Sequence, residues 1–192
     1  MIKKQLLAIA IVLAGFSGVK AQKNTILLGG NVEFQSTKTG DNKSHDFNLS
    51  PFVGYQWDQH WTAGVGFTAG AGKTEVNNIQ TAKYNSFGVS PFVRYTCPIS
   101  PIFSTFVQAD AGFLNTKFDD LDGKQKQFNA NIIPYAAINI KNGLALNFSV
   151  GGISYGSTEP RLGGTKTNSF DINFGKQASV GISKNFNLKK KA

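Results

Sequence analysis

Few of the side chains that perform acid–base or nucleophilic chemistry lie close together in this sequence. The nearest approach to a catalytic set is Ser44, His45 and Asp46, which place a hydroxyl, an imidazole and a carboxylate at consecutive positions. Such groups activate a nucleophile only when they meet in space. Consecutive side chains of a strand point to opposite faces, so these three cannot form a triad by themselves. The sequence therefore predicts a protein that is not an enzyme, and catalysis through His45 is the alternative.

Two short motifs resemble ligand-binding loops but have the wrong spacing. Gly70–Thr74 (GAGKT) matches the end of a phosphate-binding loop, yet Phe67 stands where its first glycine belongs. Asp119–Gly123 (DDLDG) has the composition of a calcium loop, yet Phe118 would be its first ligand and Asn129 its last. We therefore expect no cofactor and no metal site. The second motif is predicted to be a solvated turn, with weak divalent-cation binding as the alternative.

The elements that carry these residues are predicted from a segment that occurs three times. The copies are Phe47–Trp57 (FNLSPFVGYQW), Phe87–Cys97 (FGVSPFVRYTC) and Phe128–Ile140 (FNANIIPYAAINI). Their prolines, Pro51, Pro91 and Pro134, are 40 and 43 residues apart. A polar break and a second alternating run follow each copy, so the repeating unit is a hairpin of two strands.

Apolar and small residues alternate clearly along these runs. In Trp61–Gly72 one face carries Trp, Ala, Val and Phe, and the other carries only Thr and Gly. We predict eight strands on this basis, at 25–36, 45–57, 61–72, 84–97, 102–116, 127–140, 144–156 and 169–186. Most reach the roughly 9 to 11 residues that a tilted strand needs to cross a bilayer.

The connections and the aromatic residues indicate where the apolar face points. Short breaks follow the even-numbered strands, and longer polar segments, at 37–44, 73–83, 117–126 and 157–168, follow the odd-numbered ones. Aromatic residues gather at the strand ends: Phe47, Trp57, Trp61, Phe87, Tyr95, Phe103, Phe113, Phe170 and Phe186. Both features are typical of membrane barrels. The predicted fold is an all-β, eight-stranded antiparallel up-and-down transmembrane β-barrel; a secreted ligand carrier with its apolar face inward is the alternative.

The N-terminal segment predicts export. Residues 1–21 read as a signal peptide, with Lys3 and Lys4 before an apolar run and Ala21 at the cleavage site, which leaves 22–192 as the barrel. Removing Lys3, Lys4 and Lys20 lowers the net charge from +9 to +6, because 17 Lys and Arg then face 11 Asp and Glu. The bases are scattered, so nucleic acid is not an expected partner. Cys97 is the single cysteine and excludes an internal disulfide.

The repeat Ser-Pro-Phe-Val-x-Tyr, at Ser50–Tyr55 and Ser90–Tyr95, and the ending SVGISKNF at Ser179–Phe186 resemble the small outer-membrane β-barrel family. That family is related to outer membrane proteins A, X and W and is common in Bacteroidetes. The resemblance implies the cell outer membrane and insertion by the barrel-assembly machinery, with Gly181 and Phe186 in the insertion signal. It also implies outer-membrane lipids and lipopolysaccharide as partners. Two departures are Lys184 within that signal and the extension at 187–192.

Inward-facing positions predict what fills the lumen. Glu33, Arg94 and Asp110 are expected to form a polar network, with Arg94 paired to Glu33 or Asp110, because an unpaired buried charge is costly. Phe52, Phe92 and Tyr135 share one inward position of the repeat and predict a constriction. The predicted role is structural or surface contact by a monomer with a plugged lumen. The alternatives are a narrow pore for small solutes or ions and a lipid-modifying barrel enzyme.

Local irregularities are predicted at five places, the three repeated prolines and two sites in the last two strands. The recurring prolines each remove one ladder donor, which requires either a shared bulge or a tolerated gap. Val150 and Ile153 cannot share a face unless a bulge lies at Gly151 and Gly152. A bulge near Gly175 is expected to turn Lys176 inward, and Lys184 is expected to lie at the periplasmic rim.

Overall fold

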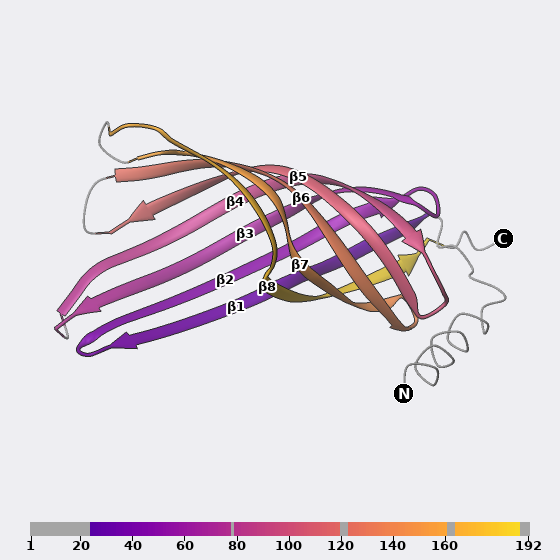
Figure 1. The fold of residues 1–192 in the computed structure, drawn as a ribbon, viewed down its shortest axis with the longest axis horizontal. Coiled ribbons are helices and arrows are strands. Elements are labelled where there is room, and N and C mark those ends of the chain that lie inside the picture. The colour runs from indigo at the N-terminus through magenta and orange to yellow at the C-terminus, as the bar shows by residue number, and fades with distance from the viewer. Residues whose placement is uncertain (1–23, 78, 120–122, 161–163, 189–192) are drawn as a thin grey trace.

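The computed structural model describes residues 24–77, 79–119, 123–160 and 164–188, so the predicted signal peptide at 1–21 lies outside the described residues. The strands are β1 (Thr25–Thr39), β2 (Asn42–Gln56), β3 (Trp61–Val76), β4 (Ile79–Pro98), β5 (Phe103–Phe118), β6 (Gly123–Lys141), β7 (Leu144–Glu159) and β8 (Thr167–Asn187). Each strand pairs antiparallel with its neighbours, and β8 returns to β1, which closes a barrel (Figure 1). The predicted fold class is confirmed. Within the described ranges no helix is long and apolar enough to span a membrane.

The strands run farther at one end than the sequence pattern predicted. The segments 37–44 and 73–83, predicted as loops, are mostly strand, and β1 and β2 are joined by a two-residue turn at Gly40 and Asp41. Gly40 has a φ of 62°, the positive value that tight hairpin turns require. The loop predictions were wrong there because polar residues continue the ladder beyond the apolar band. The hairpins project together at the end opposite the termini (Figure 1).

The apolar side of every strand faces away from the barrel axis. Phe113 and Phe170 are 67% and 68% exposed, whereas the inward-facing Thr25 and Thr62 are 0% and 1% exposed. A soluble carrier would show the opposite distribution, so that alternative is wrong. An apolar outer face and a polar, small-residue lumen are what a lipid environment requires of a closed barrel.

The three repeated prolines lie where the ladder to the next strand is interrupted. Pro51 is opposite Gly30 of β1, but the β2–β3 ladder has no pairs between Leu49↔Ala69 and Phe52↔Gly66. The β4–β5 ladder skips Pro91 in the same way, and both ladders resume in register. Pro134 instead coincides with a register shift between β6 and β7. The missing N–H is therefore accommodated by a gap at the first two prolines and by a bulge at the third.

The predicted irregularities in β7 and β8 are also present. The register shifts between Ser149↔Ser179 and Gly151↔Phe174, and Gly151 and Gly175 have positive φ values of 107° and 85°. This bulge places Val150 and Ile153 on the outer face, as predicted. The side chain of Lys176 lies outside the described part of the structure.

The seam between the first and last strands is short. β1 and β8 pair only from Thr25↔Asn187 to Gly30↔Ile182. Beyond this point the two strands separate, and in Figure 1 the far ends of β1 and β8 lie on opposite sides of the molecule. The β7–β8 register shift around Gly175 lies farther along β8, beyond its last pair with β1 at Ile182.

Candidate functional site

Arg94 lies at the centre of the lumen. It sits on β4 between Thr62 of β3 and Gln108 of β5, and it is only 6% exposed. Its Nε and Nη2 donate hydrogen bonds to Gln108 Oε1 at 3.2 and 2.8 Å. Its guanidinium carbon lies 3.9 Å from the centroid of the Phe106 ring, a close cation–π contact. A buried cation is thus held by an amide oxygen and an aromatic face.

The network around Arg94 differs from the one predicted. Asp110 accepts a hydrogen bond from Asn131 Nδ2 at 2.9 Å and is also hydrogen-bonded to Gln108, so Gln108 links Arg94 to Asp110. The ion pairs among the described residues are Lys73–Glu75, Lys83–Asp119 and Lys166–Glu159. A direct pairing of Arg94 with Asp110 is therefore not formed.

Strand register explains this difference. Gln108 lies directly opposite Arg94, while Asp110 lies opposite Phe92, two residues farther along the strand. The residues level with Arg94 on the preceding strands are Thr62, Gln56 and Thr25. Glu33 lies far beyond Thr25 on β1 and is exposed, so it does not meet Arg94.

Four aromatic side chains surround the guanidinium. Phe52 and Phe92 meet edge to face with centroids 5.7 Å apart, and Tyr135 stacks on Phe106 at 4.6 Å. Phe52, Phe92 and Tyr135 are the predicted constriction residues, whereas Phe106 was not predicted. The inward phase that Phe106 shares with Gln108 and Asp110 on β5 was the signal that identifies it.

Glycines on the neighbouring strands make room for these rings. A Cβ at Gly64 would lie 2.6 Å from Phe92 Cζ and would also meet the backbone of β2. A Cβ at Gly54 would lie 3.1 Å from the same Phe92 atom. The absence of side chains at these positions allows the Phe92 ring to lie flat against the barrel wall.

Two cavities meet at this cluster. The lower cavity is defined as the one at the end with the short turns, and it has a volume of about 420 Å³. The upper cavity, of about 150 Å³, lies toward the projecting hairpins. Arg94, Phe106 and Asn147 line both cavities. These three side chains therefore lie where the two cavities meet, between the two ends of the lumen.

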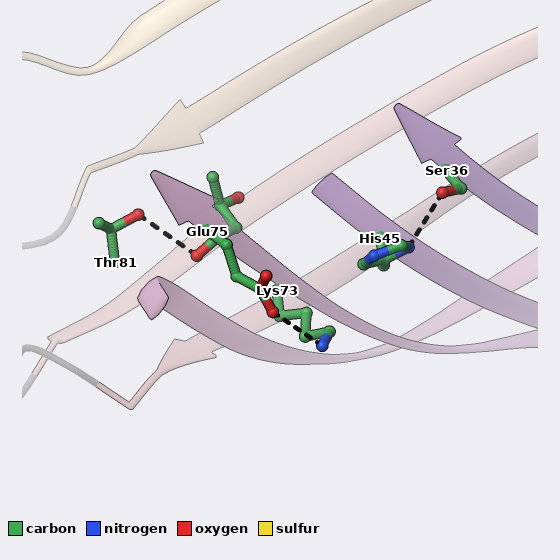
Figure 2. A network of polar contacts seen from close by, with 6 residues as sticks. Ser36, His45, Lys73, Glu75 and Thr81 are labelled. Atoms are coloured by element: carbon green, nitrogen blue, oxygen red, sulfur yellow. Dashed lines mark hydrogen bonds and ion pairs between the residues drawn. The ribbon is translucent and has the colours of Figure 1, made fainter. Parts of the chain in front are cut away.

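The polar residues at the projecting end do not form a catalytic triad. His45 Nδ1 lies 3.0 Å from Ser36 Oγ on the outer face, next to the Lys73–Glu75 pair and the Thr81 bond to the Thr74 carbonyl (Figure 2). Asp46 points into the lumen, where it accepts hydrogen bonds from Tyr84 at 2.6 Å and Ser44 at 3.0 Å. His45 and Asp46 are thus on opposite faces of β2, as the strand geometry predicts.

The ligand-loop motifs have no loop structure in the described residues. Gly70–Thr74 lies within β3, and Lys73 donates to Glu75 Oε1 at 3.0 Å. This hydrogen bond, together with the charge of Lys73, lowers the pKa of Glu75, which lies beyond the lipid-facing band. Asp119–Gly123 includes residues 120–122, which lie outside the described residues. The described part of the chain contains no group of three or more His, Cys, Asp or Glu that could hold a metal ion.

A family model for the outer membrane protein beta-barrel domain matches residues 7–186, which is nearly the whole chain. The chain belongs to this family. It is therefore an outer-membrane barrel, and its apolar outer face is the lipid-facing surface. Short turns of such barrels face the periplasm, which places the larger cavity at the periplasmic end and the projecting hairpins outside the cell.

Among solved structures, the chain is similar to the outer membrane protein Ail of Yersinia pestis, determined as a backbone structure in a phospholipid bilayer nanodisc. The two share 15% sequence identity, and the match covers 85% of this chain and 100% of Ail with a TM-score of 0.34. No curated protein matches the chain.

Of the two predicted insertion-signal residues, Phe186 lies at the periplasmic end of the barrel and Gly181 lies farther in, at the upper cavity. Phe186 faces outward and is paired with Ile26 of β1, while Gly181 faces the lumen beside Asn31. Lys184 also faces outward, with its Nζ 5.0 Å from the centroid of the Phe186 ring. Lys184 thus reaches the periplasmic rim, where its charge is hydrated.

Proposed function

We propose that this outer-membrane barrel has a structural or surface-contact role and does not conduct solutes, because its lumen is plugged. The observation that carries the proposal is the partition formed by Arg94, Phe106 and Asn147 between the two cavities. The partition is made of side chains that are 6%, 4% and 6% exposed and are held by hydrogen bonds and ring stacking. Interlocked side chains of this kind fill the interior of small barrels.

Conductance measurements distinguish a plugged lumen from the alternative, a narrow pore. We expect the refolded chain to give no stable open channel in a planar bilayer. Removing the Phe106 ring and the Arg94 charge together, by Phe106→Ala with Arg94→Ala, joins the two cavities and should produce measurable openings. Lys184→Gln, which removes one charge from the outer face, is the matched control and should stay closed. A stable open channel in the unmodified protein would defeat the plug.

The alternative of a lipid-modifying enzyme receives no support from the outer rim. His45 has a hydroxyl neighbour, Ser36, but the nearest carboxylate along the strand, Asp46, is on the lumen side. Glu75, the neighbouring carboxylate on the outer face, is hydrogen-bonded to Lys73 and has only a longer-range electrostatic interaction with His45. A base that is not held by an acid lacks the arrangement that activates a serine. We therefore propose a protein without catalytic residues, cofactor or metal.

The outer face supports lipopolysaccharide and outer-membrane lipids as partners. Lysines lie directly opposite one another in three hairpins, as Lys38↔Lys43, Lys73↔Lys83 and Lys117↔Lys124. Like charges directly opposite destabilise a sheet unless an anion lies between them. The pairs lie farther along their strands, toward the projecting hairpins, than exposed apolar residues such as Phe113. Lys73 and Lys83 are already paired with Glu75 and Asp119, so the support comes from Lys117↔Lys124, where an anionic headgroup would offset the repulsion.

We also propose that the chain belongs to the subgroup related to outer membrane proteins A, X and W of the Bacteroidetes type. The Ser-Pro-Phe-Val-x-Tyr repeat supports this assignment, with Pro51 and Pro91 at matching ladder gaps. We further propose that the protein is a monomer, exported by the signal peptide at 1–21 and inserted by the barrel-assembly machinery through Gly181 and Phe186.

A further inference from the structure

The periplasmic cavity has the size and shape of a small-molecule site. Its volume of about 420 Å³ falls within the range of about 300 to 1,000 Å³ that ligand pockets occupy. Residues of the short turns, including Gln59, Pro101 and Asn142, surround its mouth, so it is reached from the periplasm. Its floor is the partition that carries Arg94.

The lining of this cavity is rich in hydrogen-bonding groups. Thr62 and Asn147 lie near the floor, and Asn147 Nδ2 donates to Ser183 Oγ at 2.9 Å. Further amide and hydroxyl groups are contributed by Gln56, Ser104, Asn139 and Asn185. These groups suit the hydroxyls of a polar ligand.

The charged side chains among the described residues that line this cavity are all positive. Its charged lining residues are Arg94 at the floor and Lys141 at the mouth, and no Asp or Glu is among the described residues that line it. The carboxylate of Asp110 lines only the upper cavity, on the far side of Gln108. The lower cavity is therefore electropositive without a protein anion inside it.

Arg94 retains hydrogen-bonding capacity for a ligand. A guanidinium has five N–H donors and stays charged at all physiological pH values. The hydrogen bonds of Arg94 run from Nε and Nη2 to a single neutral acceptor, Gln108 Oε1. A buried guanidinium held in this way is best compensated by an oxyanion that accepts two parallel hydrogen bonds.

We propose that the periplasmic cavity is a binding site for a small polar molecule that carries a carboxylate or a phosphate. The anionic group pairs with Arg94 at the floor, the hydroxyls of the ligand meet the amides and hydroxyls of the wall, and Lys141 attracts the ligand at the mouth. The site is independent of the surface-contact role, because it lies on the periplasmic side of the partition.

The test is an NMR titration of the refolded chain in a non-ionic detergent that contains no phosphate. The probes are gluconate, its neutral counterpart glucose, and inorganic phosphate. The sequence contains two arginines, Arg94 and Arg161, so each Nε–Hε signal is assigned by substitution of the other. We expect gluconate and phosphate to shift the Arg94 signal saturably, gluconate to bind more tightly, and glucose to leave the signal unchanged. Arg161 should not move.

Three variants locate the site. Arg94→Gln lacks the reporter signal, so its binding is measured by isothermal titration calorimetry; gluconate should bind at least about tenfold more weakly, the scale of losing a charge-assisted hydrogen bond. Lys141→Gln should weaken it a few-fold and reduce its dependence on salt. Lys184→Gln removes an equal charge from the outer face and should leave binding unchanged. Heat-modifiable gel migration checks that each variant is folded.

The proposal is overturned if gluconate and phosphate produce no saturable Arg94 shift over the millimolar range. Equal responses to gluconate and glucose would also overturn it, as would an equal loss of binding in Lys141→Gln and Lys184→Gln. These last two outcomes do not depend on the folding of Arg94→Gln. None of them depends on whether the barrel conducts.

Discussion

At the periplasmic half of the barrel all eight strand pairs are hydrogen-bonded, whereas at the outer half β1 and β8 separate. The periplasmic half has interlocked lumen side chains, with Arg94 against Phe106 and Phe92 against glycine. The outer half continues as hairpins, and its inward-facing Glu33 is exposed. Closure of the seam therefore coincides with the part of the barrel that holds the Arg94 cluster and the periplasmic cavity.

The two halves therefore differ in the pairing of the seam as well as in the contacts inside the lumen. Between Thr25 and Gly30, β1 faces an uninterrupted stretch of β8. Farther along β8, residues 175–178 are unpaired in the ladder with β7, and Gly175 has a positive φ of 85°. A gap at membrane depth exposes backbone groups that lipid cannot satisfy, so the seam is the weakest ladder of the barrel.

Filling the space beside Phe92 should have the largest effect on stability, because it disturbs the packing of the Phe92 ring and of β2 against β3. A Cβ at Gly64 would meet the β2 backbone and the Phe92 ring. We expect Gly64→Ala to destabilise the barrel by about 1 to 3 kcal/mol, as overpacking does. Urea unfolding in lipid vesicles, followed by tryptophan fluorescence, measures the change.

Gly66→Ala is the matched control for that experiment. Gly66 is on the same strand and the same face, but its nearest atom to an added Cβ is 3.6 Å away, an ordinary contact. Its stability should be unchanged or slightly raised, since alanine restricts the unfolded chain. Equal destabilisation by both substitutions would contradict the role assigned to Phe92.

Disulfide trapping of the seam compares the two halves directly. In a Cys97→Ser background, Leu28→Cys with Lys184→Cys places two cysteines at a paired position, and a disulfide should form rapidly. Phe34→Cys with Ala178→Cys would be opposite only if the same register continued outward. That pair should cross-link slowly or not at all. Comparable rates in membranes, read from gel mobility, would show that the seam is closed along its length.

Relieving one lysine pair should have the smallest effect. Lys117 lies opposite Lys124, and directly opposed like charges cost roughly 0.2 to 1 kcal/mol. In neutral vesicles we expect Lys117→Gln to raise stability by a few tenths of a kcal/mol. In vesicles with lipopolysaccharide the same change should lower it, because an anion contact is lost. A shift of the same sign in both vesicles would argue against headgroup binding at this pair.

Much of the fold could be predicted because alternation is a local property of the chain. The outward phase of Phe47 to Trp57 and the phase change at Gly151 follow from a period of two residues, whatever the partner strand. The bulge near Gly175 was predicted from the same alternation, which would otherwise place Lys176 on the outer face, and the register shift confirms it. Strand ends were less predictable, since the polar residues near Gly40 are compatible with a loop or with a hairpin in water.

The sequence by itself determined the eight strands, their faces and the residue types that enter the lumen. Only the tertiary structure decided which of those residues meet. Gln108 lies opposite Arg94 only in the observed register of β4 and β5; a shift of two residues would place Asp110 there. Phe106 meets Tyr135 because the register of β5 and β6 places them opposite each other. The short seam between β1 and β8 joins the first and last strands of the chain. These pairings are non-local, so no pattern within one strand specifies them.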